Sequence, residues 1–201
     1  QLEKLHITVQ LGTAATPELV ESLKPYAVFV AAGASPLIPH SIPGIDGENV
    51  YTASDILSEK VILTGKTVVV VGAGMTGLET AEYLASQGNH VSVYDLLPEV
   101  AAGEHFQNII DVERRLTGVG QFTEHKLLEI TPASCVFQQA DGSQVTVSCD
   151  AVVLSMGMRP NLGFAQQFAH FPNFQLLGTN VAYSGIGPAV ESGFLAAYNL
   201  Q

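Results

Sequence analysis

Four consecutive valines, Val68–Val71, constrain the fold of this chain more than any other feature. An uninterrupted apolar run of this length is typical of a strand that is buried on both faces of a parallel sheet. The run leads directly into a glycine motif at residues 72–77, and apolar residues at helical spacing follow from Leu78. This order of strand, glycine turn and helix predicts a doubly wound, Rossmann-like α/β domain.

The three glycines of the motif have different expected roles. Gly72 permits a tight turn, Gly74 lets a pyrophosphate approach the backbone, and Gly77 lets the helix pack close to the strand. The first helical turn, which includes Met75 and Thr76, offers free N–H groups and the positive end of the helix dipole to phosphates. The motif therefore predicts a dinucleotide site, although glycines at such a turn can also be purely structural.

Asp95 ends the next apolar strand, residues 91–94. A carboxylate at this place in a dinucleotide-binding unit accepts hydrogen bonds from the ribose hydroxyls. No arginine or lysine follows closely, so we expect NADH to be preferred over NADPH. The alternative is that Asp95 is a solvated turn residue.

The balance of charge excludes some classes of partner. The net charge is −11, with 19 acidic residues against 8 Lys and Arg. This charge argues against nucleic acid and anionic membrane surfaces as partners. No apolar run approaches the ~20 residues of a membrane span, and the chain does not start like a signal peptide.

Cysteine and histidine give no metal or disulfide pattern. Cys135 and Cys149 form no CxxC motif, so we expect free thiols and a reducing, cytoplasmic compartment. The six histidines show no ligand spacing and are interpreted as ordinary loop or surface residues: His6, His40, His90, His105, His125 and His170.

The other elements are predicted by apolar pattern and turn residues. Strands are expected at residues 6–9, 26–31, 121–124, 126–130, 135–139, 145–147, 151–154 and 174–177. Helices are expected at residues 17–23, 54–59, 106–116 and 188–200, with Thr16 as the N-cap of the first. The proline-rich passage 36–47 is expected to be a connector between domains.

Two strands leave through similar glycine–proline exits, at residues 32–36 and 156–160. We therefore predict a dinucleotide-binding domain at residues 66–160, inserted in a second, discontinuous nucleotide domain at residues 1–65 and 161–201. Because Gln1 is not a natural start, the chain is expected to be an excised fragment.

Three segments carry a family resemblance: residues 28–36, 70–81 and 150–161. They resemble the C-terminal part of Old Yellow Enzyme-like NADH:flavin oxidoreductases, such as 2,4-dienoyl-CoA reductase, enoate reductase and trimethylamine dehydrogenase. This group lies within the pyridine nucleotide-disulfide oxidoreductase superfamily. The resemblance implies NAD(H) binding in this chain, and FAD in a parent flavoprotein whose other parts hold FMN and an iron–sulfur cluster.

The resemblance also implies roles for single residues. Glu79 matches a glutamate near the nicotinamide, although it also reads as a first-turn acid that favours the helix dipole. Gly157, in the second exit, is also expected to bind the cofactor. Arg159 and Asn161 approach the cofactor or fix the exit, and we favour the second role. The family's FAD-binding glycine motif is absent, and Thr179 stands where its ribityl-binding acid belongs.

The sequence thus predicts an NADH-binding part of a flavin-dependent oxidoreductase, in which NADH passes a hydride to FAD. Two alternatives remain open at this point. One is a non-catalytic module that holds ADP or a similar nucleotide, and the other is an interaction scaffold with a vestigial site.

Overall fold

A computed structural model describes residues 2–178 and 185–200 and divides the chain into two compact units. Unit 1 consists of Gln1–Ser35 and Pro160–Gln201, and unit 2 consists of Pro36–Arg159.

Unit 2 is built around a five-stranded sheet whose neighbouring strands are all parallel. Its strands, in spatial order, are β3 (Val50–Thr52), β10 (Ala151–Leu154), β4 (Thr67–Val71), β5 (His90–Tyr94) and β6 (Gly120–Phe122). The valine run lies in the central strand, as its continuous apolar pattern predicts, and Val68–Val71 are 0–4% exposed.

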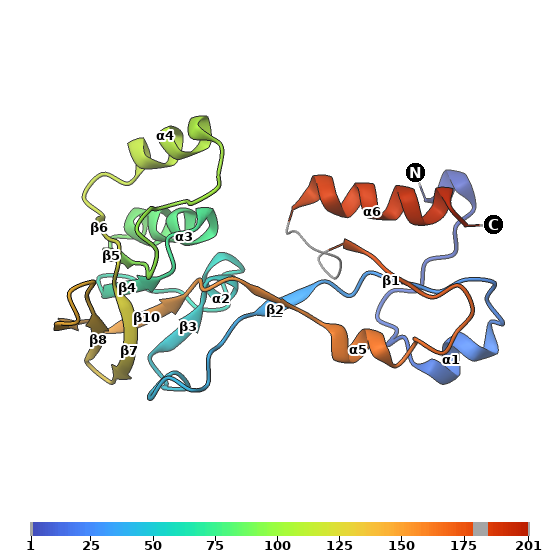
Figure 1. The fold of residues 1–201 in the computed structure, drawn as a ribbon, viewed down its shortest axis with the longest axis horizontal. Coiled ribbons are helices and arrows are strands. Elements are labelled where there is room, and N and C mark those ends of the chain that lie inside the picture. The colour runs from blue at the N-terminus through green and yellow to red at the C-terminus, as the bar shows by residue number, and fades with distance from the viewer. Residues whose placement is uncertain (1, 179–184, 201) are drawn as a thin grey trace. The chain divides into compact units, whose positions relative to one another are not determined.

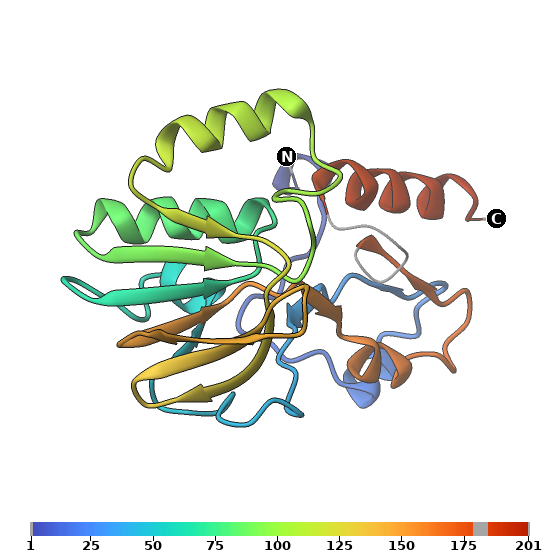
Figure 2. The same cartoon turned by 60° about the vertical axis from the view of Figure 1, so that its left-hand side comes forward.

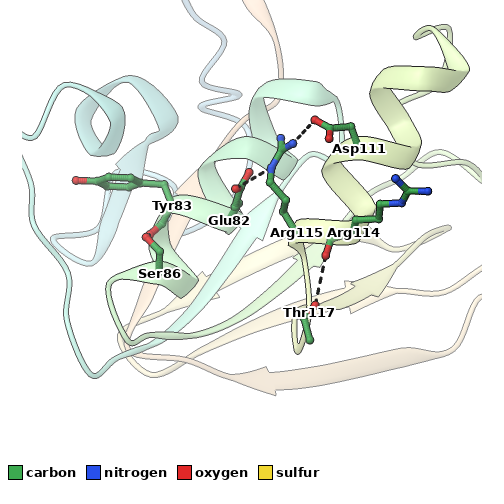
Figure 3. A network of polar contacts seen from close by, with 7 residues as sticks. All are labelled: Glu82, Tyr83, Ser86, Asp111, Arg114, Arg115 and Thr117. Atoms are coloured by element: carbon green, nitrogen blue, oxygen red, sulfur yellow. Dashed lines mark hydrogen bonds and ion pairs between the residues drawn. The ribbon is translucent and has the colours of Figure 1, made fainter.

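Helices cover one face of this sheet (Figures 1 and 2). They are α2 (Ala53–Leu57), α3 (Met75–Ser86) and α4 (Phe106–Arg115). Val68 and Val70 point to this side and pack in one cluster with Leu78, Ala81 and Val112. Figure 3 shows a polar link between the two longer helices, in which Arg115 of α4 binds Glu82 of α3 and Asp111 of its own helix.

A second, antiparallel sheet covers the other face (Figures 1 and 2). It contains β7 (Lys126–Thr131), β8 (Ser134–Gln138) and β9 (Gln144–Ser148), in that order. Because side chains alternate along a strand, Val69 and Val71 face this sheet and pack in a cluster with Leu127 and Phe137. We call this cluster, which also contains Tyr94, Cys135 and Cys149, the sheet-side core.

The boundary of unit 2 differs from the predicted start at residue 66. Unit 2 begins at Pro36, because β3 pairs with β10 and extends the main sheet. The proline-rich passage is therefore not a linker: Ile45 is buried, and Ile38 and Ile42 pack against the sheet-side core. The prediction omitted β3, whose three residues lack an apolar run long enough to signal a strand.

Unit 1 has little regular sheet. It contains η1 (Glu3–Leu5), α1 (Pro17–Ser22), α5 (Leu162–Gln166) and α6 (Ile186–Tyr198). Its parallel strands, β1 (Phe29–Val30) and β12 (Gln175–Leu176), have two residues each. A small core of Val28, Val30, Ala165, Phe168 and Phe171 holds it together. Strands β2 (Ala34–Pro36) and β11 (Met158–Pro160) form a further two-stranded sheet at the boundary.

The sequence predictions for unit 1 are confirmed in part. Thr16 caps α1 as predicted, and its side-chain oxygen accepts from the Leu19 N–H at 3.3 Å. The strand predicted at residues 6–9 is wrong, because that segment is exposed irregular chain after η1 and lacks a partner strand in the described part. Thr179 lies outside the described residues.

No helix among the described residues is long and apolar enough to cross a membrane.

Candidate functional site

Two glycines of the motif are required by close backbone packing. Gly72 has φ +110°, and a Cβ there would collide with the carbonyl oxygen of Ser155. A Cβ on Gly77 would collide with the carbonyl oxygen of Gly72. These contacts let α3 start directly above the end of β4, and they agree with the turn and packing roles expected for the two residues.

Gly74 is different, because nothing lies within 4 Å of the position that its Cβ would take. It is exposed and forms the N-cap of α3, without a side-chain cap. The first intrahelical bond runs from the Leu78 N–H to the Gly74 carbonyl, at 3.0 Å. The amides of Met75, Thr76 and Gly77 therefore have no intrahelical acceptor and lie at the positive end of the helix.

Asp95 fixes the glycine turn from the end of β5. One carboxylate oxygen accepts from the Ala73 N–H at 2.5 Å, and the other accepts from the Leu97 N–H at 2.7 Å. The side chain is half-buried, and each oxygen retains a lone pair for a further donor. Sequence reasoning predicted Asp95 as a ribose ligand but missed this structural role.

A pocket of about 440 Å³ opens beside this carboxylate. Its walls come from the carboxyl ends of three neighbouring strands: Gly72 after β4, Asp95 after β5, and Ser155 and Met156 after β10. The chain connections run in opposite directions on the two sides of β4, since β5 follows it directly and β10 returns much later. Ligands of open α/β sheets bind at such a switch point.

The rings of Tyr94 and His125 belong to the lining of the pocket. Tyr94 stacks on Phe137 with ring centroids 4.4 Å apart, and His125 meets Tyr94 edge-on at 5.4 Å. Burial raises the pKa of Tyr94, with smaller contributions from Cys135 and Cys149, so its hydroxyl stays protonated at neutral pH.

His125 is not the ordinary loop residue that the sequence suggested. It lines the pocket, and its Nδ1 lies 2.5 Å from the Thr123 carbonyl oxygen. That contact assigns the proton to Nδ1, so that Nε2 accepts from the Gln139 side-chain amide at 3.1 Å.

The lining of the pocket also includes a cation. The His125 N–H donates to the Asp95 carbonyl at 2.7 Å, and the next residue, Lys126, lines the pocket. Lys126 is distant in sequence from the glycine motif, and only the packing of β7 against the main sheet places it there. No sequence signal near Asp95 could have found it.

Of the predicted site residues, Gly72 and Asp95 line the pocket, whereas the others do not: Gly74, Met75, Thr76, Gly77, Glu79 and Gly157. Glu79 is exposed and is the fifth residue of α3, whose first turn holds no acid, so its interpretation as a first-turn acid is wrong. Gly157 is exposed with φ +99°, and its carbonyl accepts from the Leu37 N–H at 2.9 Å.

Asn161 lies in unit 1 and holds the first exit. Its side-chain amide donates to the Ala32 carbonyl at 2.9 Å, and its oxygen accepts from the Ser35 hydroxyl at 2.8 Å. These bonds are those of a residue that fixes the exit. Among the described residues, no group of three or more His, Cys, Asp or Glu is placed to hold a metal ion.

A model of the pyridine nucleotide-disulphide oxidoreductase family matches residues 3–172. The chain belongs to this family. A bilirubin reductase of Mediterraneibacter gnavus is 34% identical and matches 98% of this chain, but only 31% of its own length is covered. An NADH oxidase of Thermoanaerobacter brockii is 30% identical over 100% of this chain and 32% of its own length.

This chain is also similar to a solved structure of 2-naphthoyl-CoA reductase in complex with 2-naphthoyl-CoA. Its TM-score is 0.89 at 27% identity, and the match covers 98% of this chain and 30% of that one. The chain therefore spans about a third of the length of these relatives. The family and the parallel sheet confirm the predicted Rossmann-like α/β class.

Proposed function

We propose that unit 2 binds NADH, with the diphosphate against the N-terminus of α3. The observation that carries this proposal is the contrast between three glycines. Backbone fills the space beside Gly72 and Gly77, whereas the space beside Gly74 is open and lies over free helical amides. A Cβ at Gly74 would occupy the cradle that a diphosphate needs, and the family match supports a dinucleotide as the ligand.

The adenosine half of the dinucleotide would occupy the pocket beside Asp95. Its volume of about 440 Å³ is suited to a group of this size. The free lone pairs of Asp95 would accept from the ribose hydroxyls, and the carboxylate would repel a 2′-phosphate. Lys126 acts in the opposite direction, so the preference for NADH over NADPH depends on the balance of these two charges.

In a longer parent protein, the chain would be the nicotinamide-binding part of a flavin-dependent oxidoreductase of the Old Yellow Enzyme-like type. The NADH oxidase and reductase names of its relatives support this proposal. When bound, NADH supplies a hydride for FAD. The FMN and iron–sulfur cluster expected from the resemblance would belong to other parts of that parent.

The chain by itself is expected to hold no stoichiometric FAD and to bind NADH without oxidising it. Within the described residues of unit 1, the parallel sheet consists of the two short strands β1 and β12, and the sequence of this chain contains no second glycine motif of the FAD-binding kind. A flavin absorbance band that persists through gel filtration of the purified chain would contradict this expectation.

The test of the binding proposal is a calorimetric titration of the chain and of Gly74→Val with NADH. The variant should lose NADH binding but keep the melting temperature of the wild type, because its side chain enters open space. Titration with ADP separates the alternative of a non-catalytic nucleotide module: an affinity for ADP equal to that for NADH would favour that alternative. Wild-type NADH affinity in Gly74→Val would overturn the phosphate site.

The hydride-transfer proposal is tested in the parent protein. Glu79 is exposed on α3 beyond the phosphate-binding turn, where it would contact the nicotinamide rather than the diphosphate. We therefore expect Glu79→Gln to slow flavin reduction in stopped-flow experiments more than it weakens NADH binding. A flavin that stays oxidised under excess NADH would contradict the reductase role.

A further inference from the structure

Two buried thiols lie side by side in the sheet-side core. The sulfur atoms of Cys135 and Cys149 are 3.7 Å apart, and the thiols are within reach of a weak S–H···S hydrogen bond. Cys135 is 0% exposed and Cys149 is 5% exposed. Both are free in this structure, as predicted, but no local pattern indicated that they are neighbours.

The hairpin register explains why they meet. In the antiparallel ladder Cys135 of β8 pairs with Val147 of β9, so Cys149 is the next residue along on the same face. Diagonal neighbours of this kind lie within the reach of their side chains. The turn at Asp141 and Gly142 fixes this register, and the Cys149 N–H donates to the Ala133 carbonyl at 3.0 Å.

Neither thiol has a part in the proposed dinucleotide site. Neither lines the pocket beside Asp95, and the side-chain hydrogen bond of each thiol is made with the other. A single buried cysteine would be explained by packing alone. Two thiols placed sulfur to sulfur have a chemistry that packing does not require.

We propose that Cys135 and Cys149 are an oxidisable pair that hydrogen peroxide converts into a disulfide joining β8 to the end of β9. In the first step the Cys149 sulfur attacks a peroxide oxygen, the O–O bond breaks, and a sulfenic acid and one water form. In the second step the Cys135 sulfur attacks the Cys149 sulfur, the S–O bond breaks, and a second water leaves. The pair loses two electrons and two protons, and one hydrogen peroxide becomes two waters.

Access to the pair comes from the edge of the sheet. β9 is an edge strand, since it pairs with β8 alone, and Cys149 directly follows its last residue. Edge strands open locally more readily than central strands do, and such opening exposes Cys149 first. The hydrogen bond from Cys135 lowers the pKa of Cys149, whereas the pKa of Cys135 is raised by the same contact and by burial. Cys149 is therefore the attacking sulfur.

The test is peroxide treatment of the full chain, followed by alkylation of the remaining thiols and mass spectrometry. We expect both alkylation sites to be lost and the intact mass to fall by two hydrogen atoms. Asp141 lies between the cysteines, so cleavage on the N-terminal side of aspartates gives two peptides that stay linked until a reductant is added. Trypsin is unsuitable, because residues 127–158 contain no Lys or Arg.

Two variants test the order of the steps. Cys135→Ala should stop at a sulfenic acid on Cys149 that dimedone traps, whereas Cys149→Ala should react much more slowly. The wild-type peptide map stands even if a variant fails to fold. The urea-unfolded chain serves as a control for the peroxide concentration. The proposal is overturned if peroxide oxidises the thiols of the unfolded chain while both thiols of the folded chain can still be alkylated. It is also overturned if the sulfurs gain oxygen without becoming linked, or if the linkage joins two chains.

Discussion

The two units use similar α/β elements but differ in how completely those elements are covered. In unit 2 the five-stranded sheet is packed on both faces, and all four residues of β10 are buried. In unit 1 the sheet has two strands of two residues, and only Ala196 of the 13 residues of α6 is buried. Ile186 and Phe194 of that helix are 85% and 64% exposed.

This difference in coverage predicts a difference in stability between the two units. A parallel sheet is stable when both of its faces are covered, because its strands are apolar throughout. Unit 2 meets this condition from its own residues. Unit 1 leaves much apolar surface in water, and we expect it to be the less stable of the two.

Of the substitutions considered, Gly72→Val is expected to have the largest effect on the stability of unit 2. The variant forces a β-branched residue to adopt φ +110° and places its Cβ on the Ser155 carbonyl, so we expect a loss of more than about 3 kcal/mol in the stability of unit 2. Circular dichroism melts measure this loss. Gly74→Val is the matched control, because the same side chain meets nothing there. Equal melting temperatures for the two variants would refute this account of the turn.

A smaller effect is expected from a matched pair of core truncations. Val153→Ala in β10 removes a side chain that is 0% exposed and should cost unit 2 about 2–3 kcal/mol. Val30→Ala removes the same atoms from β1, where Val30 is 6% exposed, and should leave the unfolding of unit 2 unchanged. Denaturant unfolding followed by hydrogen exchange of each unit distinguishes the two effects. If both variants shifted both units equally, the two would not unfold independently.

Asp95→Ala is expected to have a smaller effect on stability than Val153→Ala. The substitution removes the acceptor of the Ala73 and Leu97 N–H groups and should destabilise the loop by about 1–3 kcal/mol. It should also weaken NADH binding more than NADPH binding, because it leaves Lys126 unopposed. Calorimetric titrations with both cofactors check this, and Lys126→Ala is the control that should shift the preference in the opposite direction. If the ratio of the NADH and NADPH affinities were unchanged in Asp95→Ala, Asp95 would not be a ribose ligand.

The smallest effect is expected from Arg115→Ala. Figure 3 shows its guanidinium between Glu82 and Asp111, and hydrogen bonds to these two residues raise the pKa of Arg115. The side chain is 41% exposed, and water and salt screen such pairs strongly. The melting temperature should therefore change little, and the change should vanish at high salt. A large loss that persists at high salt would show that the network is structurally important.

Local patterns were sufficient to predict most of unit 2. The valine run and the glycine motif predicted β4 and α3, because each signal lies within a few residues. The short strand β3 escaped prediction, since its three residues are held by pairing with β10. The strand expected at residues 6–9 failed for the opposite reason: the pattern was present, but the part of the chain that the structure describes holds no partner strand for it.

The candidate site was predictable only along the chain. Gly72, Gly74, Gly77 and Asp95 follow from one strand–turn–helix–strand unit. His125 and Lys126 reach the pocket through the packing of β7 against the main sheet, which no local pattern encodes. The Cys135–Cys149 contact likewise depends on the register of a hairpin rather than on the spacing of the two residues.

The central claim is that unit 2 alone carries the dinucleotide site. Hydrogen–deuterium exchange of the chain with and without saturating NADH tests it most directly. We expect NADH to slow exchange in the glycine turn at residues 72–78. We expect the same in the two segments beside the pocket, residues 95–97 and 125–127. Exchange in β1 and β12 should be unchanged. Protection confined to unit 1, or none in the glycine turn under saturating NADH, would contradict this claim.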